Sequence, residues 1–247
     1  MYDEHTKIGL LVLRQHLGVP YRELCLMLPS LRAWRGRVPD HSTLVKFSGR
    51  VGQGVLEAVL RATASMLCGC GMTVAVDSTG FSCSSASRHF TRRLVEMGQG
   101  EGMGHAGTSR KRFLKASLAV DTGTLVVLAC DCVDSRHTDV RRMTHVVDGL
   151  VDGGYGISYV VADKGYDVEY VHREVSERLG ARAFIPPRSS ASPARASSTR
   201  VRTSGFHRGL MRSELDLGVY ARRALVETVN SMVKRKMGGR RRPGARR

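Results

Sequence analysis

The chain has 247 residues with 39 Lys and Arg against 22 Asp and Glu, which gives a formal net charge of +17. Its length allows one large or two small domains, and 42% of its residues are apolar, which suffices for a core and excludes wholesale disorder. No stretch approaches the roughly 20 apolar residues of a membrane span, and the N-terminus lacks a signal-peptide cleavage site. We therefore expect a cytoplasmic protein with no membrane partner. The positive charge favours nucleic acid as the partner, because Lys and Arg that neutralise phosphates release counterions.

Residues 1–70 are predicted to form a small all-helical region. Apolar residues recur there at helical spacing in the stretches 8–17, 24–28 and 51–67. In the segment 38–47, either Asp40 or Ser42 is suited to cap a further short helix. Short helices joined by a tight turn suit DNA docking, although a plain bundle with a solvated basic face fits the same pattern. The candidate DNA-binding residues on one side of this short helix are Thr43, Lys46 and Arg50.

From residue 71 onward, short β-branched or alternating runs replace the helical spacing and predict strands. Asp121-Thr-Gly123 lies between two of these runs and is typical of a hairpin turn. The order strand, hairpin, helix, strand, helix, strand predicts an α/β fold with a mixed sheet flanked by helices. The predicted strands are 72–76, 114–120, 124–129, 157–162 and 183–186, and the predicted helices are 138–150 and 168–179, the latter closed by Gly180.

The last part of the chain is predicted to hold a basic loop, a helix and a basic tail. Residues 188–209 are rich in Ser and Arg and carry no acidic residue, so we expect a loop or disordered segment that continues to residue 218. A helix is predicted from Val219 to Met237. Gly and Pro break the tail 238–247, which we expect to be disordered. The predicted domains are thus a DNA-binding region over 1–70 and an α/β core over 71–237.

The six cysteines include two Cys-x-Cys pairs and no Cys-x-x-Cys, the spacing that zinc fingers and ribbons use. Cys130 and Cys132 would lie on the same face of a strand, where a free Cys behaves as a small apolar residue. We expect reduced cysteines that pack, with metal binding or a disulfide as the alternatives.

Three acidic residues lie at the ends or edges of predicted elements. Asp77 follows the strand 72–76, Asp163 ends the strand 157–162, and Glu227 lies in the last helix. Carboxylates at neighbouring strand ends can converge, and Mg²⁺ prefers carboxylate oxygens together with water and substrate phosphate. Such a cluster can hold two ions about 3.5–4 Å apart for phosphodiester chemistry. Taken singly, each acid also fits a solvated turn position.

The last predicted helix gathers polar groups in one narrow arc. Tyr220, Arg223, Glu227 and Lys234 lie within about 60° of one another at about 100° per residue. A functional interpretation assigns Glu227 to metal and the two cations to DNA phosphates. The structural alternative is an i,i+4 salt bridge between Arg223 and Glu227 that contributes a few tenths of a kcal/mol.

The spacing Tyr220-x2-Arg223-x3-Glu227-x6-Lys234 resembles the signature around the last acid of DDE-type insertion-sequence transposases. Ala162-Asp-Lys-Gly-Tyr-Asp167 is similar to the segment that carries the second acid of those enzymes, and Val76-Asp-Ser-Thr79 to the segment that carries the first. The segment 38–47 is similar to the N-terminal helical region of the same group. The resemblance covers most of residues 1–236, and the combination of motifs is specific.

This resemblance implies a ribonuclease-H-like core in which Asp77, Asp163 and Glu227 bind two Mg²⁺ or Mn²⁺ ions. It implies a prokaryotic, nucleoid-associated enzyme that acts as a homodimer on double-stranded DNA. Enzymes of the family cut the ends of their own mobile element and join the freed 3′ hydroxyls to a target phosphodiester. The segment between Pro187 and Val219 is too short for the large β-rich insertion of some family members, so the chain looks closer to the compact IS-five-like group.

Two features depart from the family pattern and are compatible with a truncated copy. Relatives continue beyond the Lys of the signature with an aromatic-bearing helical region, whereas this chain changes to Gly, Arg and Pro. Its first residues also match a stretch that relatives reach after a leader. The alternative functions are a structure-specific nuclease with the same core and a non-catalytic basic DNA-binding protein.

Overall fold

The computed structural model describes residues 2–32, 34–82, 113–134, 139–187, 206–208 and 216–237. These residues form two compact units, one of residues 2–59 with 235–237 and one of residues 60–234. The tail 238–247, most of the basic loop 188–218 and Cys83 lie outside the described residues. No helix within the described ranges is long and apolar enough to cross a membrane.

The N-terminal unit consists of short helices around a small leucine core, which confirms the predicted helical region. Helices α1 (Glu4–Leu17), α2 (Tyr21–Met27) and α3 (His41–Ser48) contribute to it, with the 3-10 turn η1 (Leu28–Ser30) after α2. Helix α4 (Gln53–Ser65) leads into the second unit. Asp40 caps α3, because its side chain accepts a hydrogen bond from the backbone N–H of Ser42 at 2.8 Å. The buried core residues are Leu10, Leu24, Leu28 and Leu44.

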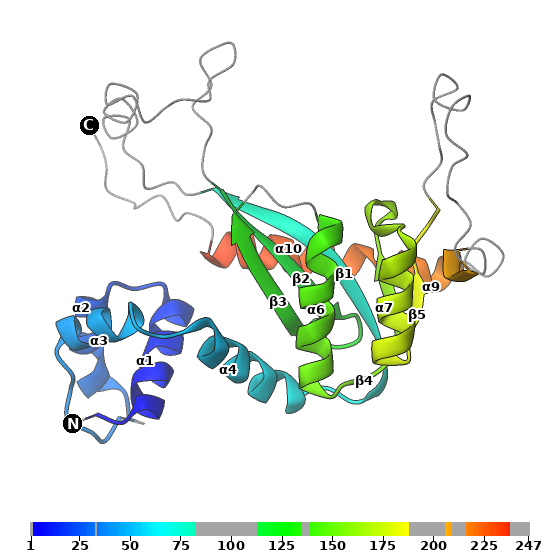
Figure 1. The fold of residues 1–247 in the computed structure, drawn as a ribbon. Coiled ribbons are helices and arrows are strands. Elements are labelled where there is room, and N and C mark those ends of the chain that lie inside the picture. The colour runs from blue at the N-terminus through cyan, green and yellow to red at the C-terminus, as the bar shows by residue number, and fades with distance from the viewer. Residues whose placement is uncertain are drawn as a thin grey trace, which may run out of the picture. The chain divides into compact units, whose positions relative to one another are not determined.

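The second unit is built on a five-stranded mixed sheet, as predicted. Its strands are β1 (Cys70–Ser82), β2 (Phe113–Asp121), β3 (Val127–Asp134), β4 (Gly156–Ala162) and β5 (Arg182–Phe184). They lie in the order β3-β2-β1-β4-β5 (Figure 1). The hairpin partners β1–β2 and β2–β3 are antiparallel, whereas β1–β4 and β4–β5 are parallel. This order and mixture of directions is consistent with the ribonuclease-H-like core that the resemblance implies.

Helices cover both faces of the sheet. In Figure 1, α6 (Asp139–Gly153) and α7 (Glu169–Leu179) lie in front of the sheet and α10 (Ala224–Met237) lies behind it. The 3-10 turn η2 (Lys164–Tyr166) follows β4, and α9 (Leu217–Ala221) precedes α10. Gly180 closes α7 with a φ of 61°, in the left-handed region that glycine adopts at helix ends.

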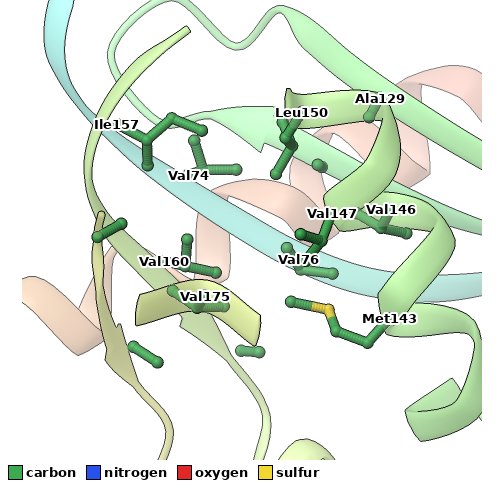
Figure 2. Packing of buried hydrophobic residues seen from close by; sticks show 14 of the residues in the cluster. Val74, Val76, Ala129, Met143, Val146, Val147, Leu150, Ile157, Val160 and Val175 are labelled. Atoms are coloured by element: carbon green, nitrogen blue, oxygen red, sulfur yellow. The ribbon is translucent and has the colours of Figure 1, made fainter. Parts of the chain in front are cut away.

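Side chains alternate along the central strand between two apolar clusters. Val74 and Val76 face α6 and α7 and pack with Met143, Val147 and other buried residues of those helices (Figure 2). Ala75, between them, faces α10 and belongs to the second cluster. Successive residues of β1 therefore face opposite sides of the sheet. This alternation indicates which side the next residues of the strand face.

Three strands differ from the prediction, and the shortest, β5, ends at Phe184 rather than at Pro186. The first continues to Ser82 rather than ending at Val76, because β2 pairs with it as far as Ser82 opposite Phe113. The third begins at Val127 rather than at 124, because Leu125 adopts a left-handed φ of 61° in the hairpin turn. Asp77 consequently lies within a strand and does not follow one.

The last helix is also not continuous as predicted. It is divided at Arg222 and Arg223 into α9 and α10. The backbone N–H of Arg223 donates to the carbonyl of Tyr220 at 2.9 Å, a three-residue hydrogen bond that tightens the chain at the break. Tyr220 therefore belongs to a different helix from Glu227.

Candidate active site

Asp77 lies on β1, and Asp163 directly follows the neighbouring strand β4. β1 and β4 pair in parallel, with Val76 opposite Ala162 at the end of their ladder, and the two aspartates are the next residues of each chain segment. Ala75 and Val161, two residues earlier, both face α10. Because side chains alternate along extended backbone, Asp77 and Asp163 face α10 as well. The structure thus brings together two of the three acids singled out in the sequence.

Helix α10 crosses the sheet over these aspartates and contributes Glu227. It packs through Val226 and Val229, which are buried in the same cluster as Ala75. One turn after Glu227, the side-chain nitrogen of Asn230 donates a hydrogen bond to Oδ2 of Asp77 at 3.1 Å. Glu227 and Asn230 are three residues apart and so lie on the same side of α10. Asp77 thus contacts α10 directly through Asn230, whereas the Glu227 side chain, on the same side of the helix, is 57% exposed.

The acids influence one another electrostatically. Burial raises the pKa of Asp77, and the negative charges of Glu227 and Asp163 act in the same direction. A hydrogen bond from the backbone N–H of Ser78 and the positive charge of Arg223 oppose this rise without cancelling it. The cluster is thus an accumulation of negative charge that an added cation would relieve.

Arg223 supplies positive charge to the site. Its guanidinium donates to Oε1 of Glu227 at 2.9 Å, with the Arg side chain 24% exposed and the Glu side chain 57% exposed. Burial alone would lower the pKa of Arg223, but Tyr220 in its ionised form and the carboxylates of Glu227, Asp163 and Asp77 raise it overall. The salt bridge expected as the structural alternative is therefore present, and it lies among the candidate metal ligands.

The chemistry of the donor set fits a divalent cation. Carboxylate and amide oxygens are the ligands that Mg²⁺ and Mn²⁺ favour. Next to Asp77, the side-chain oxygen of Asn230 is buried and has no hydrogen-bond partner among the described residues. Within the same ranges, no three His, Cys, Asp or Glu side chains lie close enough to form a metal cluster by themselves. Glu227 instead pairs with Arg223, so closing the cluster requires its side chain to turn.

The raised pKa of Asp77 yields a prediction for stability. The folded chain binds the Asp77 proton more tightly than the unfolded chain does, so its stabilising contribution is full below the ordinary pKa of 3.8 and is lost as the pH rises through the raised value. At neutral pH without metal, Asp77 therefore opposes folding. We expect Asp77→Asn to raise the Tm in EDTA at pH 7.5 by a few degrees, with a smaller gain at pH 4. Thermal unfolding followed by circular dichroism measures both values, and a lower Tm for the variant at pH 7.5 would contradict the expectation.

The other candidate residues are distributed over both units. Lys234 is exposed on α10, two turns after Glu227, and Tyr220 lies on α9. In the N-terminal unit, Thr43 and Lys46 are exposed on α3. Arg50 lies beyond the end of that helix, since α3 stops at Ser48 and the Arg50 backbone N–H donates to the carbonyl of Phe47. The expectation that all three side chains share one helix side is therefore wrong for Arg50.

Sequence reasoning missed a polar connection on the opposite face of the sheet. The hydroxyl of Ser78 lies 2.9 Å from the hydroxyl of Tyr166 and 2.8 Å from that of Ser117. Tyr166 is buried, and burial raises its pKa, so it stays protonated. Its hydrogen bond joins the turn η2, which follows Asp163, to Ser78, which follows Asp77. The only sequence signal for this hydrogen bond was the presence of Tyr166 three residues after Asp163 in the segment 162–167.

The predicted arrangement of Cys130 and Cys132 is confirmed. Their sulfur atoms lie 3.5 Å apart on β3 without forming a disulfide, and Cys132 is exposed, so the expectation that it packs is wrong. Cys130 packs against the cluster that faces α10. The side-chain hydrogen bond from Cys130 lowers the pKa of Cys132 to about 7.

Comparison with known protein families identifies the family of this chain. The family described as transposase DDE domain matches residues 69–247, a range that begins just before β1 and includes all three acids. No curated protein matches the chain.

Proposed function

Because the chain belongs to the family of DDE transposases, we propose that it is the transposase of an insertion sequence of the IS-five-like group. The observation that carries the proposal is the placement of Asp77 and Asp163 at the end of the parallel β1–β4 ladder, on the face of the sheet that α10, the helix with Glu227, covers. We propose these three acids as the catalytic residues, residues 1–70 as the DNA-binding region and 71–237 as the catalytic core. The proposed reaction is cleavage at the element ends followed by joining of the 3′ ends to target DNA.

Asp77, Asp163 and Glu227 are the residues that would hold the divalent cations, Mg²⁺ or Mn²⁺. Such ions, when bound, would supply Lewis-acid activation of the attacking oxygen and stabilisation of the leaving oxygen in a phosphodiester displacement. The chain fixes two of the carboxylates through the backbone, because β1 and β4 are hydrogen-bonded up to the residues that precede them. Helix α10 carries the third carboxylate, that of Glu227, which pairs with Arg223 in this structure and would have to turn to join the other two.

Basic residues near the acids are suited to hold DNA phosphates. Arg223 donates to Glu227 in this structure and is free to donate to a phosphate once Glu227 turns towards the aspartates. Lys234 is exposed on the same helix. We propose Tyr220, Arg223 and Lys234 as contacts at the catalytic core, and Thr43, Lys46 and Arg50 as contacts from the N-terminal unit. We further propose that the enzyme acts as a homodimer that holds two element ends.

Inverted repeats in the genomic DNA that flanks the gene provide the substrate for a direct test. End-labelled duplexes that carry these repeats are incubated with the protein and Mg²⁺. We expect cleavage at the repeat boundary and joining of the 3′ hydroxyl to a second duplex. Cleavage of flaps or junctions regardless of the repeats would instead identify a structure-specific nuclease. Binding without any cleavage would leave a basic DNA-binding protein, and either result would overturn the proposal.

The salt dependence of DNA affinity tests the phosphate contacts. If Arg223 and Lys234 each hold one phosphate, each Ala substitution should weaken binding about equally for all sequences and reduce the slope of log K against log salt by about one. Fluorescence anisotropy over a range of NaCl concentrations measures the slope. Arg173→Ala is the matched control, because Arg173 is 57% exposed on α7, on the opposite face of the sheet. A slope unchanged by Arg223→Ala would favour a plain helix salt bridge with Glu227.

A further inference from the structure

Asn230 is a buried polar residue in an otherwise apolar stripe of α10. Its exposed fraction is 6%, and Val226 and Val229 beside it are buried against the sheet. A core-facing position of this kind normally holds an aliphatic side chain, and a buried polar group is expected to have all its partners satisfied. Apolar packing alone therefore does not explain why an Asn occupies this buried position.

The hydrogen bond to Asp77 fixes the orientation of the Asn230 amide. A carboxylate only accepts hydrogen bonds, so the atom that lies 3.1 Å from Oδ2 of Asp77 must be the amide nitrogen. The side-chain oxygen then has no hydrogen-bond partner within the described part of the chain, although it is buried. The amide of Asn230 thus contacts the proposed metal ligand Asp77 through its nitrogen and carries the unpaired acceptor on its oxygen.

A divalent cation at Asp77 would satisfy this acceptor. Amide oxygens of Asn are ordinary ligands of hard cations and accept hydrogen bonds equally well from a bound water. The amide nitrogen at the same time holds Oδ2 of Asp77, which orients that carboxylate as outer partners orient metal ligands in other sites. Resting on the proposed function, we propose that Asn230 is a fourth residue of the metal site, which positions Asp77 and offers its own oxygen to the cation or its water.

Mn²⁺ binding to the full chain tests this role without any DNA reaction. The unbound Mn²⁺ signal in electron paramagnetic resonance gives the affinity of each variant. We expect Asn230→Leu to weaken Mn²⁺ binding about 10–100-fold, the usual effect of removing a residue that orients a metal ligand. We expect Asn230→Asp, which keeps the side-chain oxygen and adds negative charge, to bind Mn²⁺ at least as tightly as the wild type. Without metal, its added charge beside Asp77 should lower the Tm.

The control variants separate this role from folding and from the proposed function. Thr228→Leu changes an exposed residue of the same helix and should leave Mn²⁺ affinity unchanged. If Asn230→Leu binds Mn²⁺ like the wild type while Asp77→Asn loses binding, the metal site stands and the role of Asn230 is refuted. If Asp77→Asn also keeps the wild-type affinity for Mn²⁺, both the proposed metal site and the role of Asn230 in it are refuted. Weak Mn²⁺ binding by both Asn230 variants, together with a lowered Tm of Asn230→Leu, would show a purely structural residue and overturn the inference.

Discussion

Replacing Asp163 by Asn is expected to reduce strand cleavage by at least about 100-fold, because a divalent cation loses one of its charged ligands. The fold should survive the change. Oδ1 of Asp163 accepts a hydrogen bond from the backbone N–H of Lys164 at 2.7 Å, and the Asn oxygen can accept the same bond. DNA binding should change little, because it depends on positive side chains elsewhere in the chain. Cleavage of a labelled element end in Mg²⁺, measured beside affinity for the same duplex, gives both quantities.

Asp152→Asn is the matched control for this loss. Asp152 is 64% exposed at the end of α6 and pairs only loosely with Arg61 at 3.8 Å, so its change should leave cleavage within about two-fold of the wild type. Glu227→Gln is expected to behave like Asp163→Asn. Equal cleavage by wild type and Asp163→Asn would remove Asp163 from the site.

Truncating Leu150 to Ala is expected to destabilise the second unit by about 2–5 kcal/mol, the range for a buried leucine that leaves a cavity. Leu150 has no exposed surface and lies among the apolar residues between α6 and the sheet, near Val74 and Ile157 (Figure 2). Because these residues also set the direction of β1, the same loss should weaken the placement of Asp77. Urea unfolding followed by circular dichroism measures the free energy.

Val151, the next residue of α6, provides the comparison for Leu150. It is 41% exposed, so Val151→Ala should change the free energy of unfolding by less than about 0.5 kcal/mol. A similar loss for the two variants would show that α6 does not pack through the face that includes Leu150.

The layout of the sheet could be predicted from the sequence because its signals are local. The apolar run 157–162 and the turn Asp121-Thr-Gly123 each specify their own conformation. Asp121 shows why, since its carboxylate accepts hydrogen bonds from the backbone N–H groups of Gly123 and Thr124 within the turn itself. The placement of Asp163 after β4 followed from the end of its apolar run.

Features that depend on distant partners could not be predicted in this way. Residues Ser78–Ser82 form strand only because β2 supplies their hydrogen bonds, and their own sequence lacks a clear alternation. The break at Arg222 and Arg223 lies in a stretch of good helix formers, so local propensity predicts a continuous helix there.

The role of Asn230 depends on Asp77, a residue 153 positions earlier in the chain. The one local signal was a polar residue in the apolar stripe of Val226, Val229 and Val233. A search of the sequence for acids alone could not find it.

A crystal structure with Mn²⁺ would test most directly the claim that three acids form one metal site. The anomalous signal of manganese locates the ion without reference to the protein model. We predict a peak within about 2.5 Å of carboxylate oxygens of Asp77 and Asp163, with Glu227 turned from Arg223 towards the ion. A fully loaded crystal with manganese bound elsewhere, and with Glu227 still paired to Arg223, would contradict this account.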